Sequence, residues 1–345
     1  MMREIVTVTA GGSELSGWKS VSAEFGASQA ARSFSLAVTE QQGAFGDVWR
    51  LAPGTEVTIL ATGDPLLAGY VDCYKPAIDK DAHEVTVTGR SKGADAVDCS
   101  ATHKTGRWEK KTLLEIAKEL DPGGVGFISQ EKLRQLDKHQ LIPGETVFES
   151  LERRCRHEGL LMIGKADGSI SFEKAGKKRA AGALIQGYNI LRATATLDHS
   201  GRHSKAIARG QRAHGHGAKA LRVEKQSQDG GIKRNRPLVV LHEGEADDDA
   251  AQARAEWEVK RRIGWSTTAE IAVQGWRDED GVLWEGNTLI YVESPALKID
   301  QDMLINAVRL EQSDNGTIAT LSLVDPRALG GSSPGGKSSG AWSAP

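Results

Sequence analysis

The stretch EVTVTGRSKGADAVDCS, residues 84–100, marks the point where the character of the chain changes. Its first half alternates apolar and polar residues through Val85 and Val87, which is typical of a strand with one buried face. Its second half contains GRSKG, residues 89–93, which matches the G-x-S-x-G pattern of a hydrolase nucleophile elbow. The stretch therefore predicts the end of a β-rich region, and it raises the question whether Ser91 is a nucleophile.

The residues before this stretch predict an antiparallel sheet or barrel. Four segments alternate in the same way and are bounded by Gly, Pro or Asp, which suits short strands. They are residues 3–10, 17–25, 32–40 and 54–72. The last of them carries Thr-Gly-Asp-Pro at residues 62–65, which predicts a hairpin turn.

The residues after Ser100 predict a small α/β unit. Two segments place apolar side chains on one helical face, and each begins with a capping box. The boxes pair Thr112 with Glu115 and Thr146 with Glu149. Asp-Gly at residues 167–168 then predicts the turn of a hairpin.

From about residue 188 the short strands return, with one helix at about 246–263. Aspartates begin this helix and basic residues end it, as the helix dipole favours. Asp-Asn-Gly at 314–316 predicts a further hairpin turn. The sequence thus predicts an α+β chain that is mainly antiparallel β. Its four parts are a first β domain at 1–92, a small α/β domain at 93–182, a second β domain at 183–329 and a flexible Gly/Ser/Pro tail at 330–345.

Composition excludes several classes of protein. The 345 residues carry a formal net charge of -2, which gives no general affinity for polyanions. The three cysteines form no C-x-x-C pair, which argues against a disulfide framework or a zinc site and suits a reducing compartment. No run of about 18 apolar residues is present and the N-terminus has no apolar signal region, so we expect no membrane-spanning segment and no signal peptide.

Residues 201–240 are strongly basic, with ten Lys and Arg against two Asp and Glu. They contain no Phe, Trp or Tyr, so they offer no stacking platform for single-stranded nucleic acid. We expect no sequence-specific nucleic-acid binding. A surface that meets an acidic neighbour is favoured, and the acidic run at Glu243, Glu245 and residues 247–249 is one candidate for that neighbour.

The remaining motifs nominate no active site. An elbow at Ser91 needs a parallel α/β sheet, whereas the preceding strands look antiparallel, so a strand end with a tight glycine turn is favoured. His199 with His203, and His214 with His216, have spacings that could suit Zn²⁺ or Cu²⁺, but the intervening glycines favour loop histidines. We therefore expect no catalytic, cofactor-binding, metal-binding or nucleic-acid-binding residues.

Two alternatives stay open on the residues alone. One is a hydrolase acting on cell wall through Ser91 or through an unidentified carboxylate pair. The other is a carbohydrate-binding β protein that stacks sugars on some of its eight tryptophans. Trp276 and Trp284 flank a predicted hairpin, and we expect them to pack across it.

Several strings, taken in order, resemble the Mu-like phage tail protein gpP family, the baseplate hub of contractile-tailed phages. They are GWKSV with RSFSLAV, LAPGTEVTIL with LLAGYVD, HEVTVTGRSKGADAVDCS, PGETVFESLERRCRHEGLLMIGKADGSISF and GWRDEDGVLWEGNTLIYVESP. The resemblance covers about residues 3–328 and leaves out the Gly-rich tail.

This resemblance implies a homotrimer with two tail-tube-like β-barrel domains in each subunit. Three subunits then form a pseudo-sixfold ring that joins the six-fold tail tube to the three-fold central spike and lines part of the channel for genome ejection. The implied partners are the spike, a tail tube or tube-initiating protein and other baseplate proteins. The protein would be a non-enzymatic virion component of the tail baseplate, without cofactors, assembled in the host cytoplasm.

Physical reasoning adds a hypothesis about the contacts. A closed ring needs two different patches on each subunit, and open strand edges are natural joints between neighbours. We therefore expect ring contacts from strand edges in residues 1–90 and 265–325. We expect the basic segment, including Arg234 and Arg236, to face either the channel or an acidic partner.

Overall fold

The computed structural model describes residues 3–39, 51–80, 83–212, 222–245 and 247–335. The first β region is an antiparallel sheet whose strand order is β3-β4-β7-β6-β5-β1-β2. Its strands are β1 (Val6–Ala10), β2 (Ser13–Leu15), β3 (Ser20–Gly26), β4 (Ser33–Thr39), β5 (Glu56–Ala61), β6 (Asp64–Ile78) and β7 (His83–Ser91). The predicted hairpin is confirmed as β5 and β6, which pair from Ala61 opposite Asp64.

The second β region follows the α/β unit in the chain. Its strands are β13 (Lys178–Ile185), β14 (Ile190–Leu197), β18 (Thr267–Gln274), β19 (Thr288–Ser294), β20 (Ile299–Ser313) and β21 (Gly316–Val324), followed by the short 3-10 helix η2 (Pro326–Leu329). The predicted turn at residues 314–316 is confirmed, since β20 and β21 pair up to Ser313 opposite Gly316. All these pairings are antiparallel except that of β13 with β19.

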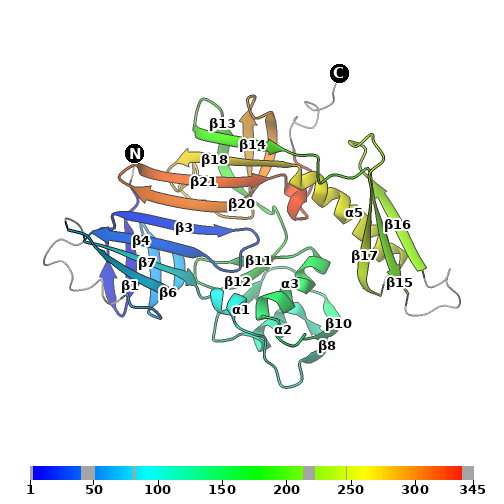
Figure 1. The fold of residues 1–345 in the computed structure, drawn as a ribbon, viewed down its shortest axis with the longest axis horizontal. Coiled ribbons are helices and arrows are strands. Elements are labelled where there is room, and N and C mark those ends of the chain that lie inside the picture. Colours follow the sequence, from blue (N-terminus) through cyan, green and yellow to red (C-terminus); the bar gives the residue numbers. More distant parts are fainter. Residues whose placement is uncertain (1–2, 40–50, 81–82, 213–221, 246, 336–345) are drawn as a thin grey trace.

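The two β regions share one 13-stranded sheet, because β3 pairs with β20. The register sets Gly26 opposite Ala307 and Val21 opposite Gln312, and β3 lies beside β20 in Figure 1. One apolar core includes residues of both regions. The mainly antiparallel class is thus confirmed. Among the described residues the strand path stays open from β14 to β2 and closes no barrel, so barrel closure remains a prediction.

The α/β unit packs below this sheet in Figure 1. Its elements are α1 (Ala94–Asp98), β8 (Arg107–Thr112), α2 (Leu113–Glu119), β9 (Phe127–Ser129), β10 (Gln135–Gln140), α3 (Val147–Glu158), β11 (Leu161–Gly164) and β12 (Ile170–Glu173). Both predicted capping boxes are present, at Thr112 with Glu115 and at Thr146 with Glu149. The apolar helix faces are buried in a second core, which is separate from that of the large sheet.

The described residues between 205 and 265 leave the large sheet and form a lobe at the right of Figure 1. The lobe contains β15 (Lys205–Gln211), β16 (Arg222–Gln228), β17 (Pro237–Glu245) and α5 (Asp248–Trp265). The helix predicted at about 246–263 is α5, and the side chain of Asp247 caps its first turn. The sequence pattern predicted the strands that became β15 and β16, but it missed β17 and did not show that these strands form a sheet of their own.

The glycines of GRSKG allow close approach between backbones. A Cβ atom at Gly89 would lie 2.1 Å from the carbonyl oxygen of Tyr70, and one at Gly93 would lie 2.1 Å from that of Ala30. Real Cβ atoms essentially never come so near to another heavy atom. The string therefore marks a strand end, as its flanking pattern predicts, at a place where neighbouring segments meet without side chains between them.

We predict that Gly93→Ala lowers the free energy of unfolding by about 2 kcal/mol or more, because the added methyl group overlaps backbone that cannot yield cheaply. Gly123→Ala is the matched control, since a Cβ there meets nothing within 4 Å and should change stability by less than about 0.5 kcal/mol. Denaturant unfolding measures both variants. Equal stability of the two would refute the close approach at Gly93.

Candidate functional site: the junction and the assembly surfaces

The side chain of Arg32, which lies just before β4, joins all three parts of the fold. Its Nε donates to the carbonyl of Gly164 in β11 at 3.0 Å, and its Nη1 donates to that of Leu66 in β6 at 3.1 Å. Its Nη2 donates to both carboxylate oxygens of Glu285, in the second β region, at 2.8 and 2.9 Å. The guanidinium also lies over the ring of Phe25 at 4.3 Å. Only 1% of Arg32 is exposed, so this cation is satisfied entirely by protein groups.

Ser91 belongs to the same junction. Its hydroxyl oxygen accepts the backbone N–H of Arg32 at 2.9 Å, and its own N–H donates to the carbonyl of Arg32 at 2.8 Å. The residue is fully buried, so its hydroxyl does not meet solvent or a dissolved substrate. Ser91 is therefore placed to hold the backbone that presents Arg32, which is the structural role favoured by the sequence.

A second ionic network fastens the start of the chain to the second β region. Arg277 donates through Nε to Glu4 at 2.7 Å and through Nη2 to the carbonyl of Ala61 at 2.9 Å. Burial alone would raise the pKa of the Glu4 carboxyl, but hydrogen bonds from Arg277 and Thr62 outweigh burial and leave that pKa below its usual value. Glu4 is thus held as a carboxylate, and the start of the chain is tied to the second β region.

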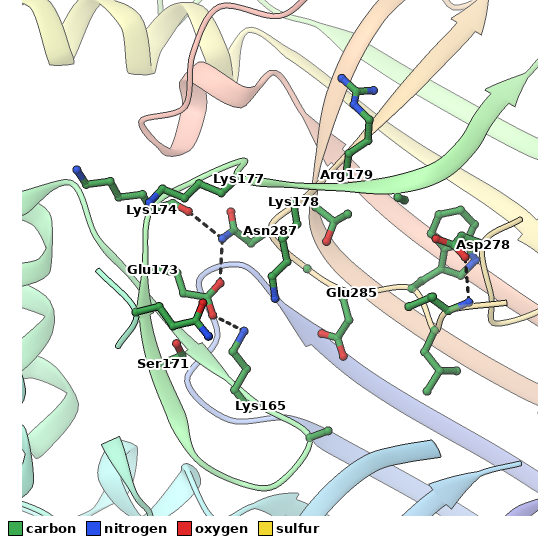
Figure 2. Close-up of a pocket in the computed structure, with 18 of the residues that line it drawn as sticks. Lys165, Ser171, Glu173, Lys174, Lys177, Lys178, Arg179, Asp278, Glu285 and Asn287 are labelled. Carbon is green, nitrogen blue, oxygen red and sulfur yellow. Dashed lines mark hydrogen bonds and ion pairs between the residues drawn. The ribbon is translucent and has the colours of Figure 1, made fainter. Parts of the chain in front are cut away.

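A cleft of about 570 Å³ opens where the α/β unit meets the second β region (Figure 2). On the α/β side of the cleft, Lys165 pairs with Glu173 at 2.5 Å. The side chain of Asn287 donates to the carbonyl of Lys174 at 3.0 Å and more weakly to Glu173 at 3.4 Å. Burial raises the pKa of Glu173, but the hydrogen bond from Lys165 and its charge outweigh burial and lower that pKa overall. The ion pair lies within the α/β unit, whereas the hydrogen bonds of Asn287 join that unit to the second β region.

The large sheet has three open edges among the described residues, at β2, β13 and β14. At the β14 edge the main core is only partly covered. The β14 residues Ile190, Ala193 and Ala195 face the main core but are only half-buried, and Leu191 on the same strand is 55% exposed. Another strand beside β14 would complete this core, which makes β14 the best candidate for a contact between subunits.

The expectation of open edges in residues 265–325 is corrected by the strand pairings. The strands there are β18, β19, β20 and β21, and each has a partner on both sides in the described structure. The pattern of apolar residues predicts a strand but not its neighbours. The open edge of the second β region lies earlier in the chain, at residues 190–197.

Much of the charge on the basic segment is paired within the lobe. Lys225 and Arg212 pair with Asp248 at the start of α5, so the acidic run that follows this segment is one of its neighbours. Arg236, suggested above as part of a contact surface, donates instead to the carbonyls of His199 and Ser200. The side chains of Glu243 and Glu245 lie outside the described structure.

His199 and His203 are engaged with neighbouring groups of their own loop. Nε2 of His199 lies 3.1 Å from Arg202, and Nδ1 of His203 lies 3.0 Å from the carbonyl of Gly201. The described residues contain no group of three or more His, Cys, Asp or Glu side chains placed to hold a metal ion. Residues 214 and 216, which are the other two candidate histidines, lie outside the described part.

The hairpin predicted between Trp276 and Trp284 is present, with an antiparallel bridge between Arg277 and Leu283. The backbone N–H of Trp284 donates to the carbonyl of Trp276 at 2.9 Å, and both side chains are buried in the main core. Neither presents a ring face to a dissolved sugar. None of the helices in the described ranges has the length and apolar character needed to cross a membrane.

Comparison with known proteins shows which family has this architecture. The chain is 31% identical to baseplate hub protein gp44 of Escherichia phage Mu over 342 residues, which covers 94% of this chain and 89% of the relative. The chain belongs to the Mu-like baseplate hub family. Three family models match the hub in order along its length. They are the GpP-like N-terminal model at residues 5–91, the gp44-like second-domain model at 93–174 and the model of the fourth domain of the Mu phage baseplate assembly protein GpP at 247–331.

Solved structures agree with this placement of the hub. The 43 kDa tail protein of prophage MuSo2 from Shewanella oneidensis is similar with a TM-score of 0.85 and 30% identity, covering 95% of this chain and all of that one. A tail protein from Neisseria meningitidis has the same fold, with a TM-score of 0.81 and 23% identity over 95% of this chain and 99% of its own. The hub is thus a baseplate protein of the phage tail.

We predict that Ser91→Ala in the hub lowers the free energy of unfolding by roughly 1–3 kcal/mol, because the backbone N–H of Arg32 loses its acceptor in a buried site. Ser100→Ala, at an exposed position, is the control and should be nearly neutral. Assays of ester and peptidoglycan hydrolysis should find no difference between the hub and Ser91→Ala. Hydrolysis that is lost in a variant of unchanged stability would restore the nucleophile interpretation.

Proposed function

We propose that the hub is a homotrimeric ring that adapts the six-fold tail tube to the three-fold central spike. It acts without catalysis and forms part of the channel through which the genome leaves. Its partners are the spike, a tail tube or tube-initiating protein and other baseplate proteins, and it is assembled into the virion from the host cytoplasm. The observation that most supports the ring is the open β14 edge, where the main core is only partly covered, in a chain that belongs to a baseplate hub family.

The symmetry argument starts from the shared sheet. Each subunit contributes two β regions, joined through β3 and β20, so three subunits present six. A six-part ring made by three chains meets a six-fold tube on one side and a three-fold spike on the other. Closure requires that one patch of each subunit binds a different patch of the next, because like-to-like contacts stop at a dimer.

The structure supports β14 as one of these two patches. Its outward backbone groups have no strand partner in the described structure, and its core-facing side chains are half-covered. A strand or loop from the next subunit would pair with these backbone groups and also cover these side chains. We further propose that the chain functions in the four parts expected from its sequence, at 1–92, 93–182, 183–329 and 330–345, with the lobe inserted in the third.

We predict that the purified hub forms a trimer at high concentration, and that Leu191→Lys weakens trimer formation by tenfold or more, which corresponds to about 1.4 kcal/mol. The exposed Leu191 tolerates lysine in the separate subunit, whereas a contact with a neighbour buries its charge. Ile142→Lys, at a similarly exposed position of the α/β unit, is the matched control.

Sedimentation and native mass measured across a concentration series report the assembly state of all three proteins. Equal trimer formation by Leu191→Lys and the unaltered chain would remove β14 from the interface. A strictly monomeric chain, both alone and with its spike, would contradict the trimer itself.

A further inference from the structure

The lobe formed by β15, β16, β17 and α5 takes no part in the proposed ring contact at β14, and it has an open strand edge of its own. Its strand order is β16-β15-β17, so β17 has a partner on one side only among the described strands. Helix α5 covers one face, where Ala208, Val223, Ala251 and Ala255 form a small core. The helix contacts β15 and β16 far more than β17, which therefore extends beyond the covered part of the sheet.

Strand β17 presents apolar side chains on the face away from the helix. Val239 is 47% exposed and Leu241 is 73% exposed, while Val240 between them packs toward the small core. Val239 lies beside Ile207 of β15 in the parallel register, so the two side chains share this outer face. An exposed apolar pair thus sits on the same strand as an open row of backbone groups.

Edges of this kind are normally protected in folded proteins by charged side chains, proline or a covering segment. Pro237 protects only the first position of β17. Residues 238–242 read Leu-Val-Val-Leu-His and contain no Lys, Arg, Asp or Glu. His242 at the far end lies against His157 of α3, with ring centroids 6.4 Å apart, so the edge without such protection is at residues 238–241. An edge of this kind with exposed apolar residues is suited to strand addition, in which backbone hydrogen bonds supply affinity and alternate side chains supply specificity.

The charge beside this edge indicates what it binds. Lys233 and Arg234 are exposed in the loop that enters β17, and neither has an ion pair with a carboxylate in the described structure. On the strands beside β17, by contrast, Arg209 pairs with Glu224 and Lys225 pairs with Asp248. The free cations therefore favour a partner that is acidic near the start of β17.

We propose that β17 docks an extended segment of a different tail protein. The segment adds a strand to the lobe, places alternate apolar side chains against Val239 and Leu241, and sets acidic residues beside Lys233 and Arg234. This surface goes beyond the tube and spike contacts of the proposed ring, because it belongs to a sheet separate from the one that carries β14.

The direct test places a photo-reactive benzoylphenylalanine at position 241 in assembled tails and identifies the cross-linked peptide by mass spectrometry. We expect a peptide from another tail protein that alternates apolar residues and contains Asp or Glu. A cross-link to a second copy of the hub, a cross-link within the same chain, or no cross-link in intact tails would overturn the proposal.

The second measurement uses Val239→Lys, Leu241→Lys and the double variant Lys233→Glu with Arg234→Glu. Each should lower the amount of the cross-linked protein in purified tails at least tenfold, while Ile142→Lys leaves it unchanged. The trimer should persist in all of them, so a failure here is distinguishable from a failure of the ring. Normal incorporation of that protein with both lysine variants would refute docking at β17.

Discussion

The buried guanidinium of Arg32 is the interaction on which the arrangement of this hub depends. A cation removed from water is costly unless each of its donors finds an acceptor. Here the acceptors are Leu66, Gly164 and Glu285, which come from the first β region, the α/β unit and the second β region. Separating any one of the three parts leaves a buried charge short of a partner, so their relative positions are fixed by hydrogen bonds that have defined directions.

This fixed arrangement suits the proposed role, in which the protein holds other tail proteins in defined relative positions. The pairing of β3 with β20 makes one sheet from two regions, and the Glu4–Arg277 pair ties the start of the chain to the far side of that sheet. A sheet built in this way resists bending at the junction between its halves. At its β14 edge the sheet leaves part of the core uncovered, and this is where the proposed ring adds a neighbouring subunit.

Local features of this fold were predictable because they depend on residues close together in the sequence. The two capping boxes, the hairpins and the end of the first β region at GRSKG follow from spacing and turn chemistry over a few positions. The role of Arg32 does not, since Glu285 lies 253 residues away and no local pattern distinguishes this arginine from others. The same holds for the lobe and for the β14 edge, because alternation shows that a segment is a strand but not which strand lies beside it. The elbow pattern at Ser91 was uninformative, and the flanking residues carried the useful signal.

The most direct test of this account is an electron cryo-microscopy map of the assembled tail tip at a resolution that traces strands. We expect three copies of the chain in a ring, with the β14 edge of each copy covered by the next and Arg32 buried between the three parts of every subunit. A map in which only the α/β unit lies at the contacts between subunits, with β14 exposed, would contradict it.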